Sequence, residues 1–256
     1  MQIVSTAWID TSLAEFELSV GLTLHAAHGR ASAEAPLRVV ILNGFEKVTP
    51  AYAEHLAAGH VLITDGSALL APWIERLPAI GRRVNRYETL CLLRWLVLRE
   101  AMQGSAFLHI DLDLFPQPSH AALASALAGR TGVLGSPCFV AVSDRDWLET
   151  WCAEIEAFGR DPEATEARLL PSPGQGRIGS DQTLLGSLLR ARILSRGDLG
   201  PLVMDYAAFD NPLMPRFRGA ATPLVASRRE ASTISATGPC CSGTCRTISR
   251  NSSGNT

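Results

Sequence analysis

Short apolar segments alternate with amphipathic stretches along most of this chain, and this alternation limits the fold more than any other feature. The apolar segments are rich in β-branched and aromatic residues and are bounded by Gly, Pro, Asn or Asp, a pattern typical of strands. They span residues 3–8, 38–43, 60–64, 106–115 and 132–142. Residues 12–28 and 49–58, which lie between them, are predicted to be helices. Alternating strands and helices predict an α/β fold with a mostly parallel sheet flanked by helices.

One long helix is predicted over residues 86–102. Asn85 can cap its start, and Glu88 three residues later completes a sequence like a capping box. Gly104 follows as a stop signal. Apolar residues cover most of the circumference of this helix, so we expect it to be buried. Arg94 interrupts the apolar surface, and we expect its guanidinium group to have an acidic partner.

Composition limits the classes of partner. The chain has 256 residues, of which 46% are hydrophobic and 19% charged, as in an ordinary soluble globular protein. A formal net charge of −2 gives no general attraction to nucleic acid or to an anionic membrane. No stretch reaches the roughly 18 uninterrupted apolar residues of a membrane span, and no signal peptide is visible. We therefore expect a cytoplasmic protein that has no transmembrane segment and does not bind nucleic acid.

The amino-acid composition changes near residue 220. From there to residue 256 the chain is rich in Ser, Thr and Gly and lacks apolar periodicity. Such a segment buries too little surface to offset the entropy that is lost on ordering. We predict one folded domain over residues 1–219 and a low-complexity tail over residues 220–256, which is either disordered or replaces a truncated part of the fold.

Two aspartates, Asp111 and Asp113, close the apolar run predicted as a strand over residues 106–115. Alternate residues of a strand point to the same face, so the strand would project both carboxylates together, and Pro116 would end it. Ligands of α/β sheets bind at the carboxyl ends of the strands. Hard carboxylate oxygens suit Mg²⁺ or Mn²⁺, although solvated aspartates at a surface strand end explain the same pattern.

The stretch RYETLCLLRWLVLREAMQGSAFLHIDLDLF, residues 86–115, resembles the core of GT-A glycosyltransferases, the nucleotide-diphospho-sugar transferases with a D-x-D motif. In those enzymes a buried helix with an Arg-Trp-like pair precedes a strand that ends in D-x-D, and the resemblance extends over roughly residues 38–189. It implies a GT-A-like, Rossmann-related fold and a transferase that binds a nucleotide-diphosphate sugar through Mn²⁺ or Mg²⁺. The acceptor would be a hydroxyl group of a glycan, a lipid or a protein.

The resemblance implies a role for each matching residue. Asp111 would contact the nucleotide ribose or the metal ion. Asp113 would bind the metal ion that bridges the diphosphate. Arg94 would lie near the donor pocket, where it would pair with one of these aspartates or contact the diphosphate.

A second candidate element begins at SDQTLL, residues 180–185. Ser180 is a good helix N-cap, and Asp181 would interact favourably with the positive end of the helix dipole. The segment also resembles the Asp-Gln pair at a helix start in GT-A enzymes, near the anomeric carbon of the donor. Asp181 would then be the general base of an inverting enzyme, or Asp181 or Gln182 would stabilise the transition state of a retaining one. The sequence does not choose between these mechanisms.

The C-terminal part of this chain differs from the pattern of GT-A enzymes. GT-A enzymes often take a further metal or diphosphate contact from this region, commonly a histidine. No histidine follows His120 in this chain. The contact would be replaced by water, supplied by another residue such as Asp210 or Asn211, or lost.

Two other functions are compatible with the same motif. An apolar strand followed by D-x-D also resembles the nucleophile loop of haloacid-dehalogenase-like phosphotransferases, with Asp111 as nucleophile and Asp113 as acid/base. That motif usually lies near the start of a chain, and the only lysine available as its partner is Lys47. The other alternative is a catalytically inactive module that binds a nucleotide sugar without transferring it.

Overall fold

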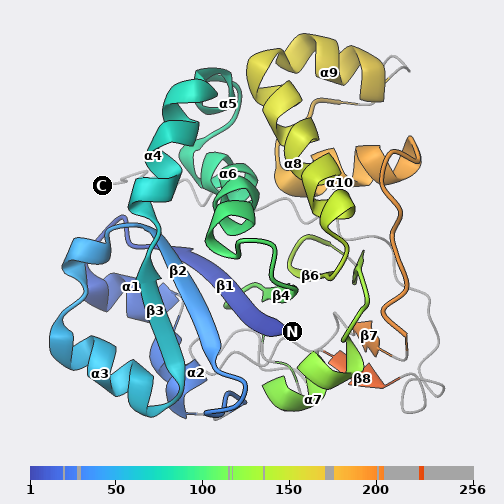
Figure 1. The fold of residues 1–256 in the computed structure, drawn as a ribbon. Helices are drawn as coiled ribbons and strands as arrows, with labels where there is room; N and C mark the ends of the chain where they lie inside the picture. The colour runs from blue at the N-terminus through green and yellow to red at the C-terminus, as the bar shows by residue number, and fades with distance from the viewer. Residues whose placement is uncertain are drawn as a thin grey trace, which may run out of the picture.

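The centre of the fold is a six-stranded sheet in the order β3-β2-β1-β4-β6-β5 (Figure 1). The computed structural model describes residues 1–19, 21–27, 30–114, 116, 118–134, 136–170, 176–200, 202–204 and 225–227. The strands of the sheet are β1 Gln2–Trp8, β2 Leu37–Asn43, β3 Val61–Asp65, β4 Phe107–Ile110, β5 Gly132–Val133 and β6 Phe139–Val142. Strands β1 to β4 are parallel, whereas β6 runs antiparallel to β4 and β5 runs antiparallel to β6. This topology confirms the predicted α/β fold with a mostly parallel sheet.

Helices cover both faces of the sheet. The helices are α1 Leu13–Ser19, α2 Leu22–Ala27, α3 Pro50–Ala58, α4 Ser67–Arg76, α5 Pro78–Arg83, α6 Arg86–Ala101, α7 His120–Ala126, α8 Arg145–Arg160, α9 Pro162–Leu169 and α10 Asp181–Arg190, with a short 3-10 helix η1 at Phe45–Lys47. Figure 1 shows α4, α5, α6, α8, α9 and α10 in the upper half of the view and α1, α2, α3 and α7 in the lower half. The sheet therefore lies between two layers of helices.

Strand β2 shows why both faces of the sheet need a cover. Val40 and Leu42 belong to the apolar cluster that includes α4, α6, α8 and α10. Leu37, Val39 and Ile41 belong to the cluster that includes α1, α2, α3 and α7. A strand that is apolar at nearly every position, rather than at alternate ones, is typical of a parallel sheet buried on both sides.

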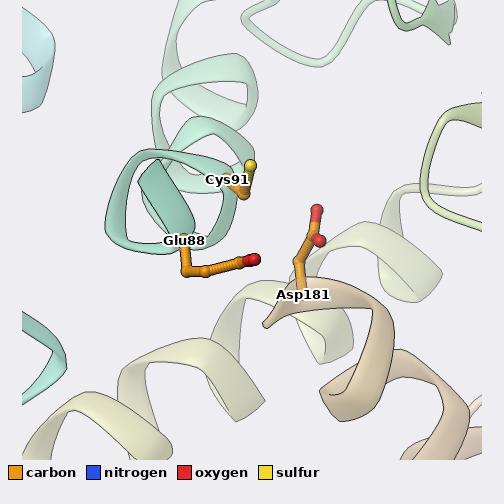
Figure 2. A group of neighbouring side chains, drawn as sticks. All are labelled: Glu88, Cys91 and Asp181. Atoms are coloured by element: carbon orange, nitrogen blue, oxygen red, sulfur yellow. The ribbon is translucent and has the colours of Figure 1, made fainter. Parts of the chain in front are cut away.

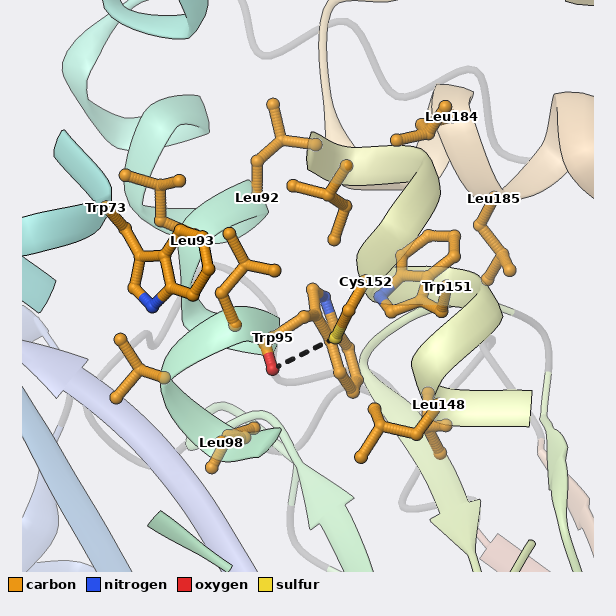
Figure 3. Packing of buried hydrophobic residues seen from close by; sticks show 14 of the residues in the cluster. Trp73, Leu92, Leu93, Trp95, Leu98, Leu148, Trp151, Cys152, Leu184 and Leu185 are labelled. Atoms are coloured by element: carbon orange, nitrogen blue, oxygen red, sulfur yellow. Dashed lines mark hydrogen bonds between the residues drawn. The ribbon is translucent and has the colours of Figure 1, made fainter. Parts of the chain in front are cut away.

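Helix α6 is the most buried helix, as its sequence predicts. Its residues from Leu90 to Leu98 are all buried, and the Asn85 side chain caps it by accepting a hydrogen bond from the Glu88 N–H at 2.9 Å. Figure 3 shows Trp95 of α6 beside Trp151 of α8. Their ring centroids lie 5.8 Å apart. The core of this face is therefore built around one helix that contacts α4, α8 and α10.

Three predicted boundaries are wrong, and each error has a local cause. The predicted helix over residues 12–28 is divided into α1 and α2, because Gly21 adopts a φ of 69° that a helix does not accommodate. The predicted strand over residues 132–142 is a hairpin of β5 and β6. The predicted strand over residues 106–115 ends at Ile110, because the chain then turns and the Leu114 N–H binds the Asp111 carbonyl at 3.0 Å.

The predicted tail lies almost entirely outside the described residues. Within it the structure describes β8 Val225–Ser227, which pairs antiparallel with β7 Leu202–Met204. Asp210, Asn211 and the remainder of residues 220–256 are outside the described part of the chain. In the described part, every helix is too short or too polar to traverse a lipid bilayer.

The buried position of α6 predicts a large loss of stability when its side chains are shortened. Leu96 is fully buried in this core, whereas Ile74 on α4 is 46% exposed. Leu96→Ala is expected to lower the free energy of unfolding by about 2–5 kcal/mol, because it removes apolar contacts and leaves a cavity. Ile74→Ala, the matched control, should cost less than about 1 kcal/mol. Equal losses for the two variants in urea unfolding would contradict this description of the core.

Candidate functional site

A buried arginine joins three separate segments at the carboxyl end of the sheet. Arg94 Nη1 donates to Asp111 Oδ1 at 2.6 Å, and Arg94 Nη2 donates to Asp181 Oδ2 at 2.8 Å. The exposed fraction of the Arg94 side chain is 6% and that of Asp181 is 4%. Burial alone would lower the pKa of Arg94, but the charges of Asp111 and Asp181 raise it well above its ordinary value. The expected acidic partner of Arg94 is confirmed, and there are two of them.

Two aromatic side chains enclose this ion-pair network. Trp95 Nε1 donates to Asp181 Oδ2 at 3.2 Å, so this oxygen receives two N–H groups. The His109 ring lies 4.9 Å from the Trp95 ring, and its Nε2 is 3.7 Å from Asp111 Oδ1. Burial, together with the nearby charge of Arg94, holds the pKa of His109 well below its usual range. His109 is therefore a neutral core residue at neutral pH.

The two aspartates of the D-x-D motif lie in the turn after β4 rather than on one face of a strand. The Asp111 N–H binds the Cys138 carbonyl at 2.8 Å, which fixes the start of the turn against the β5–β6 hairpin. The Asp111 side chain is 28% exposed, and Asp113 is exposed. Desolvation raises the pKa of Asp111 to about 6 although Arg94 opposes this effect, and desolvation by the surrounding protein also raises the pKa of Asp113. Both carboxylates are thus presented at the carboxyl edge of the sheet.

The start of α10 places one site candidate inside the protein and one outside. Ser180 is the N-cap, as predicted, and its side chain accepts a hydrogen bond from the Thr183 N–H at 3.1 Å. Asp181 is buried against Arg94, whereas the next residue, Gln182, is exposed. The two adjacent candidates therefore have different access to a ligand.

A fourth carboxylate, Glu88, lies beside Asp181 and was not recognised as a site candidate from the sequence. Figure 2 shows Glu88 and Cys91 on one side of α6 facing Asp181, and the candidate ligand atoms of the three residues lie within 4.8 Å of one another. Burial and then the charge of Asp181 raise the pKa of Glu88. Burial raises the pKa of Cys91 to about 12, so its thiol stays protonated at neutral pH. The only sequence signal at Glu88 was its position in the helix cap, because its proximity to Asp181 depends on the fold.

Two aromatic residues line the same edge of the sheet. Tyr87 is 60% exposed, and its ring meets that of Trp8 edge to face at a centroid distance of 5.3 Å. Desolvation, followed by nearby negative charges that include Asp111 and Asp113, raises the pKa of Tyr87. Tyr87 therefore presents an exposed ring where β1 ends, packed against Trp8.

Lys47 and Asp65, at the end of β3, bind backbone groups. Lys47 Nζ donates to the carbonyl groups of Ile9 and Thr11, each at 2.8 Å. Asp65 Oδ1 accepts a hydrogen bond from the Ser67 N–H at 2.8 Å and so stabilises the turn into α4. Both side chains therefore form hydrogen bonds with backbone groups near them.

Comparisons with known proteins give a fold similarity only. No protein-family model and no curated protein sequence matches this chain. Among solved structures, the chain is similar to one titled "PaToxG Glycosyltransferase", with 10% sequence identity and a TM-score of 0.44. The similarity covers 75% of this chain and 68% of that chain. At this sequence identity the similarity describes the path of the backbone and gives no correspondence between side chains.

The geometry around Arg94 predicts a large effect on stability. Arg94→Met leaves Asp111 and Asp181 without their cation, and the free energy of unfolding should fall by about 3–5 kcal/mol. Urea unfolding at neutral pH measures this loss. In the double variant Arg94→Met with Asp181→Leu, part of the loss should be recovered, because the buried charge is removed together with its partner.

An exposed ion pair provides the matched control. Arg86 pairs with Asp10 at 2.9 Å, and their side chains are 62% and 38% exposed. Arg86→Met is expected to cost about 1 kcal/mol or less. If Arg94→Met cost no more than Arg86→Met, the Arg94 network would not have the structural role described above.

Proposed function

We propose that this protein is a metal-dependent glycosyltransferase, which moves a sugar from a nucleotide-diphosphate donor to an acceptor hydroxyl group. The observation that carries the proposal is the position of Asp111 and Asp113. Both follow β4 at the carboxyl edge of a parallel sheet, which is the edge where α/β proteins bind ligands. The resemblance of residues 86–115 to GT-A glycosyltransferases supports the same assignment.

The residues present at this edge fit a hard divalent cation. Arg94 binds Asp111 Oδ1, and among the described residues no hydrogen bond is directed at Asp111 Oδ2. The ion pairs of the described part of the chain involve Asp111 but not Asp113. Carboxylate oxygens together with water and phosphate oxygens suit Mg²⁺ or Mn²⁺. When bound, the metal ion would stabilise the negative charge of the leaving diphosphate.

The aromatic residues at this edge of the sheet suit the base of a nucleotide donor. Tyr87 offers an exposed ring, and Trp8, at the carboxyl end of the strand next to β4, supports that ring from the side. Stacking of a base on an aromatic ring contributes about 1–3 kcal/mol and tolerates different bases. The proposal therefore includes a nucleotide base on Tyr87 with the diphosphate toward Asp113.

In the proposed reaction the acceptor oxygen forms a bond to the anomeric carbon of the donor sugar. The bond from that carbon to the diphosphate oxygen breaks, the nucleoside diphosphate leaves with the electron pair, and the acceptor proton passes to a base. Asp181 Oδ2 already receives two N–H groups and is buried. We therefore assign Asp181 the role of holding Arg94, and we assign contact with the substrate to Gln182 and Glu88, which are more accessible.

The phosphotransferase alternative gains no support from the described residues. Its nucleophilic aspartate would need a lysine partner, and Lys47 binds the carbonyl groups of Ile9 and Thr11 instead. The inactive binding module differs from the proposed enzyme only in turnover. Donor binding without transfer or hydrolysis of the sugar would establish that alternative.

Binding of a nucleotide tests the metal assignment directly. Uridine, guanosine, adenosine or cytidine diphosphate is expected to raise the Tm of the wild-type protein only when Mn²⁺ is present, by about 5–10 °C for one of them at 100 times its Kd. Asp113→Asn should keep the Tm of the free protein and lose this shift. Asp146→Asn, an exposed aspartate on α8, should keep it. A normal Mn²⁺-dependent shift in folded Asp113→Asn would refute the assignment.

A substitution at Gln182 tests the catalytic role of α10 without changing the stability of the protein. Because its side chain is exposed, Gln182→Ala should leave the Tm and the nucleotide-induced shift unchanged. If Gln182 contacts the sugar in the transition state, kcat for release of nucleoside diphosphate should fall roughly 100-fold. Arg190→Ala, at the far end of the same helix, is the control. Unchanged kcat in Gln182→Ala would remove this residue from the mechanism.

A further inference from the structure

The turn that carries the two aspartates is held from behind by α2. His25 Nε2 lies 2.7 Å from the carbonyl oxygen of Leu112, the residue between Asp111 and Asp113. A carbonyl oxygen only accepts hydrogen bonds, so Nε2 carries the hydrogen and donates it. His25 is 6% exposed, and Leu112 is also 6% exposed. This contact is therefore shielded from water and connects segments 87 residues apart.

A second contact joins the same two regions. The His120 N–H binds the Arg30 carbonyl at 2.8 Å. The segment that begins with the aspartates and continues to α7 is thus attached near both of its ends to the chain around α2. Both contacts are hydrogen bonds to backbone carbonyl groups, so their consequence for a ligand is positional.

The hydrogen bond to Leu112 acts on Asp113 through the peptide plane. The carbonyl group of Leu112 and the N–H and Cα of Asp113 belong to one planar unit. A donor that fixes the direction of this carbonyl therefore also fixes where the Asp113 side chain starts. Asp111 is held differently, by Cys138 at its backbone and by Arg94 at its carboxylate, whereas the ion pairs of the described residues do not include Asp113.

We infer that His25 is a positioning residue for the metal site, which sets the distance between the Asp113 and Asp111 carboxylates through the carbonyl group of Leu112. The inference rests on the proposed function, in which both aspartates bind the metal ion. Without the N–H of His25, the buried carbonyl loses its partner, and the turn rotates to satisfy it. Such a rotation displaces Asp113 while the core around Arg94 stays in place.

Three substitutions at His25 separate the hydrogen bond from simple packing. His25→Leu removes the donor. His25→Gln keeps an N–H at about the reach of Nε2, and His25→Asn keeps an N–H that is too short to reach Leu112. Exposed His55 on α3 provides the control His55→Leu. The readouts are the Kd for Mn²⁺ alone, measured by calorimetry, and the Tm of the free protein.

The expected result is a weaker metal site in a folded protein. His25→Leu and His25→Asn should raise the Kd for Mn²⁺ about 10–100-fold, as loss of a supporting hydrogen bond does at metal sites. His25→Gln should restore the affinity to near the wild-type value, and His55→Leu should not change it. If His25→Leu fails to fold, the comparison of His25→Gln with His25→Asn still decides the question.

Two further results would overturn the inference, and they are distinguishable. If the wild-type protein binds Mn²⁺ and His25→Asn binds it equally well, or His25→Gln binds it as poorly as His25→Asn, His25 does not position the site although the proposed function stands. If the folded wild-type protein binds no Mn²⁺ with or without a nucleoside diphosphate, the proposed function fails and the role of His25 fails with it.

Discussion

The buried ion pairs of Arg94 are the interaction on which the candidate site depends. Moving a charged group out of water costs several kcal/mol, and this cost is offset only when the partners are held in good geometry. Asp111 and Asp181 lie 17 and 87 residues from Arg94 in the sequence. The turn after β4 and the start of α10 must therefore stay fixed relative to α6. A planar guanidinium group suits this task because its N–H groups point in different, fixed directions.

The hydrophobic core and the site are parts of one structure rather than neighbouring regions. Trp95 packs against Trp151 in the core and also donates to the carboxylate of Asp181. The same packing excludes water from the Arg94 ion pairs, which strengthens their attraction. A change in the apolar surface of α6 is thus expected to reach the aspartates as well as the stability of the domain.

The features that the sequence predicts correctly depend on residues close together in the chain. The strand pattern predicts the parallel sheet, and Asn85 and Ser180 cap their helices as expected. The predicted end of β4 was wrong because the apolar pattern continues to residue 115, whereas the chain turns at Asp111, where the Leu114 N–H binds the Asp111 carbonyl. Glu88 and His25 were missed for a different reason, since their neighbours at the site come from distant segments.

The two aspartates of the motif are held by different means, and this difference bears on how the turn would meet a cation. Asp111 is fixed at its carboxylate by Arg94, which compensates part of its charge. Asp113 has a fixed starting point but an exposed side chain, so its charge is the less compensated of the two. A site with one preorganised ligand loses less freedom on binding than a site with two mobile ones. In the proposed function Asp111 defines the place of the metal ion, and Asp113 supplies most of the attraction.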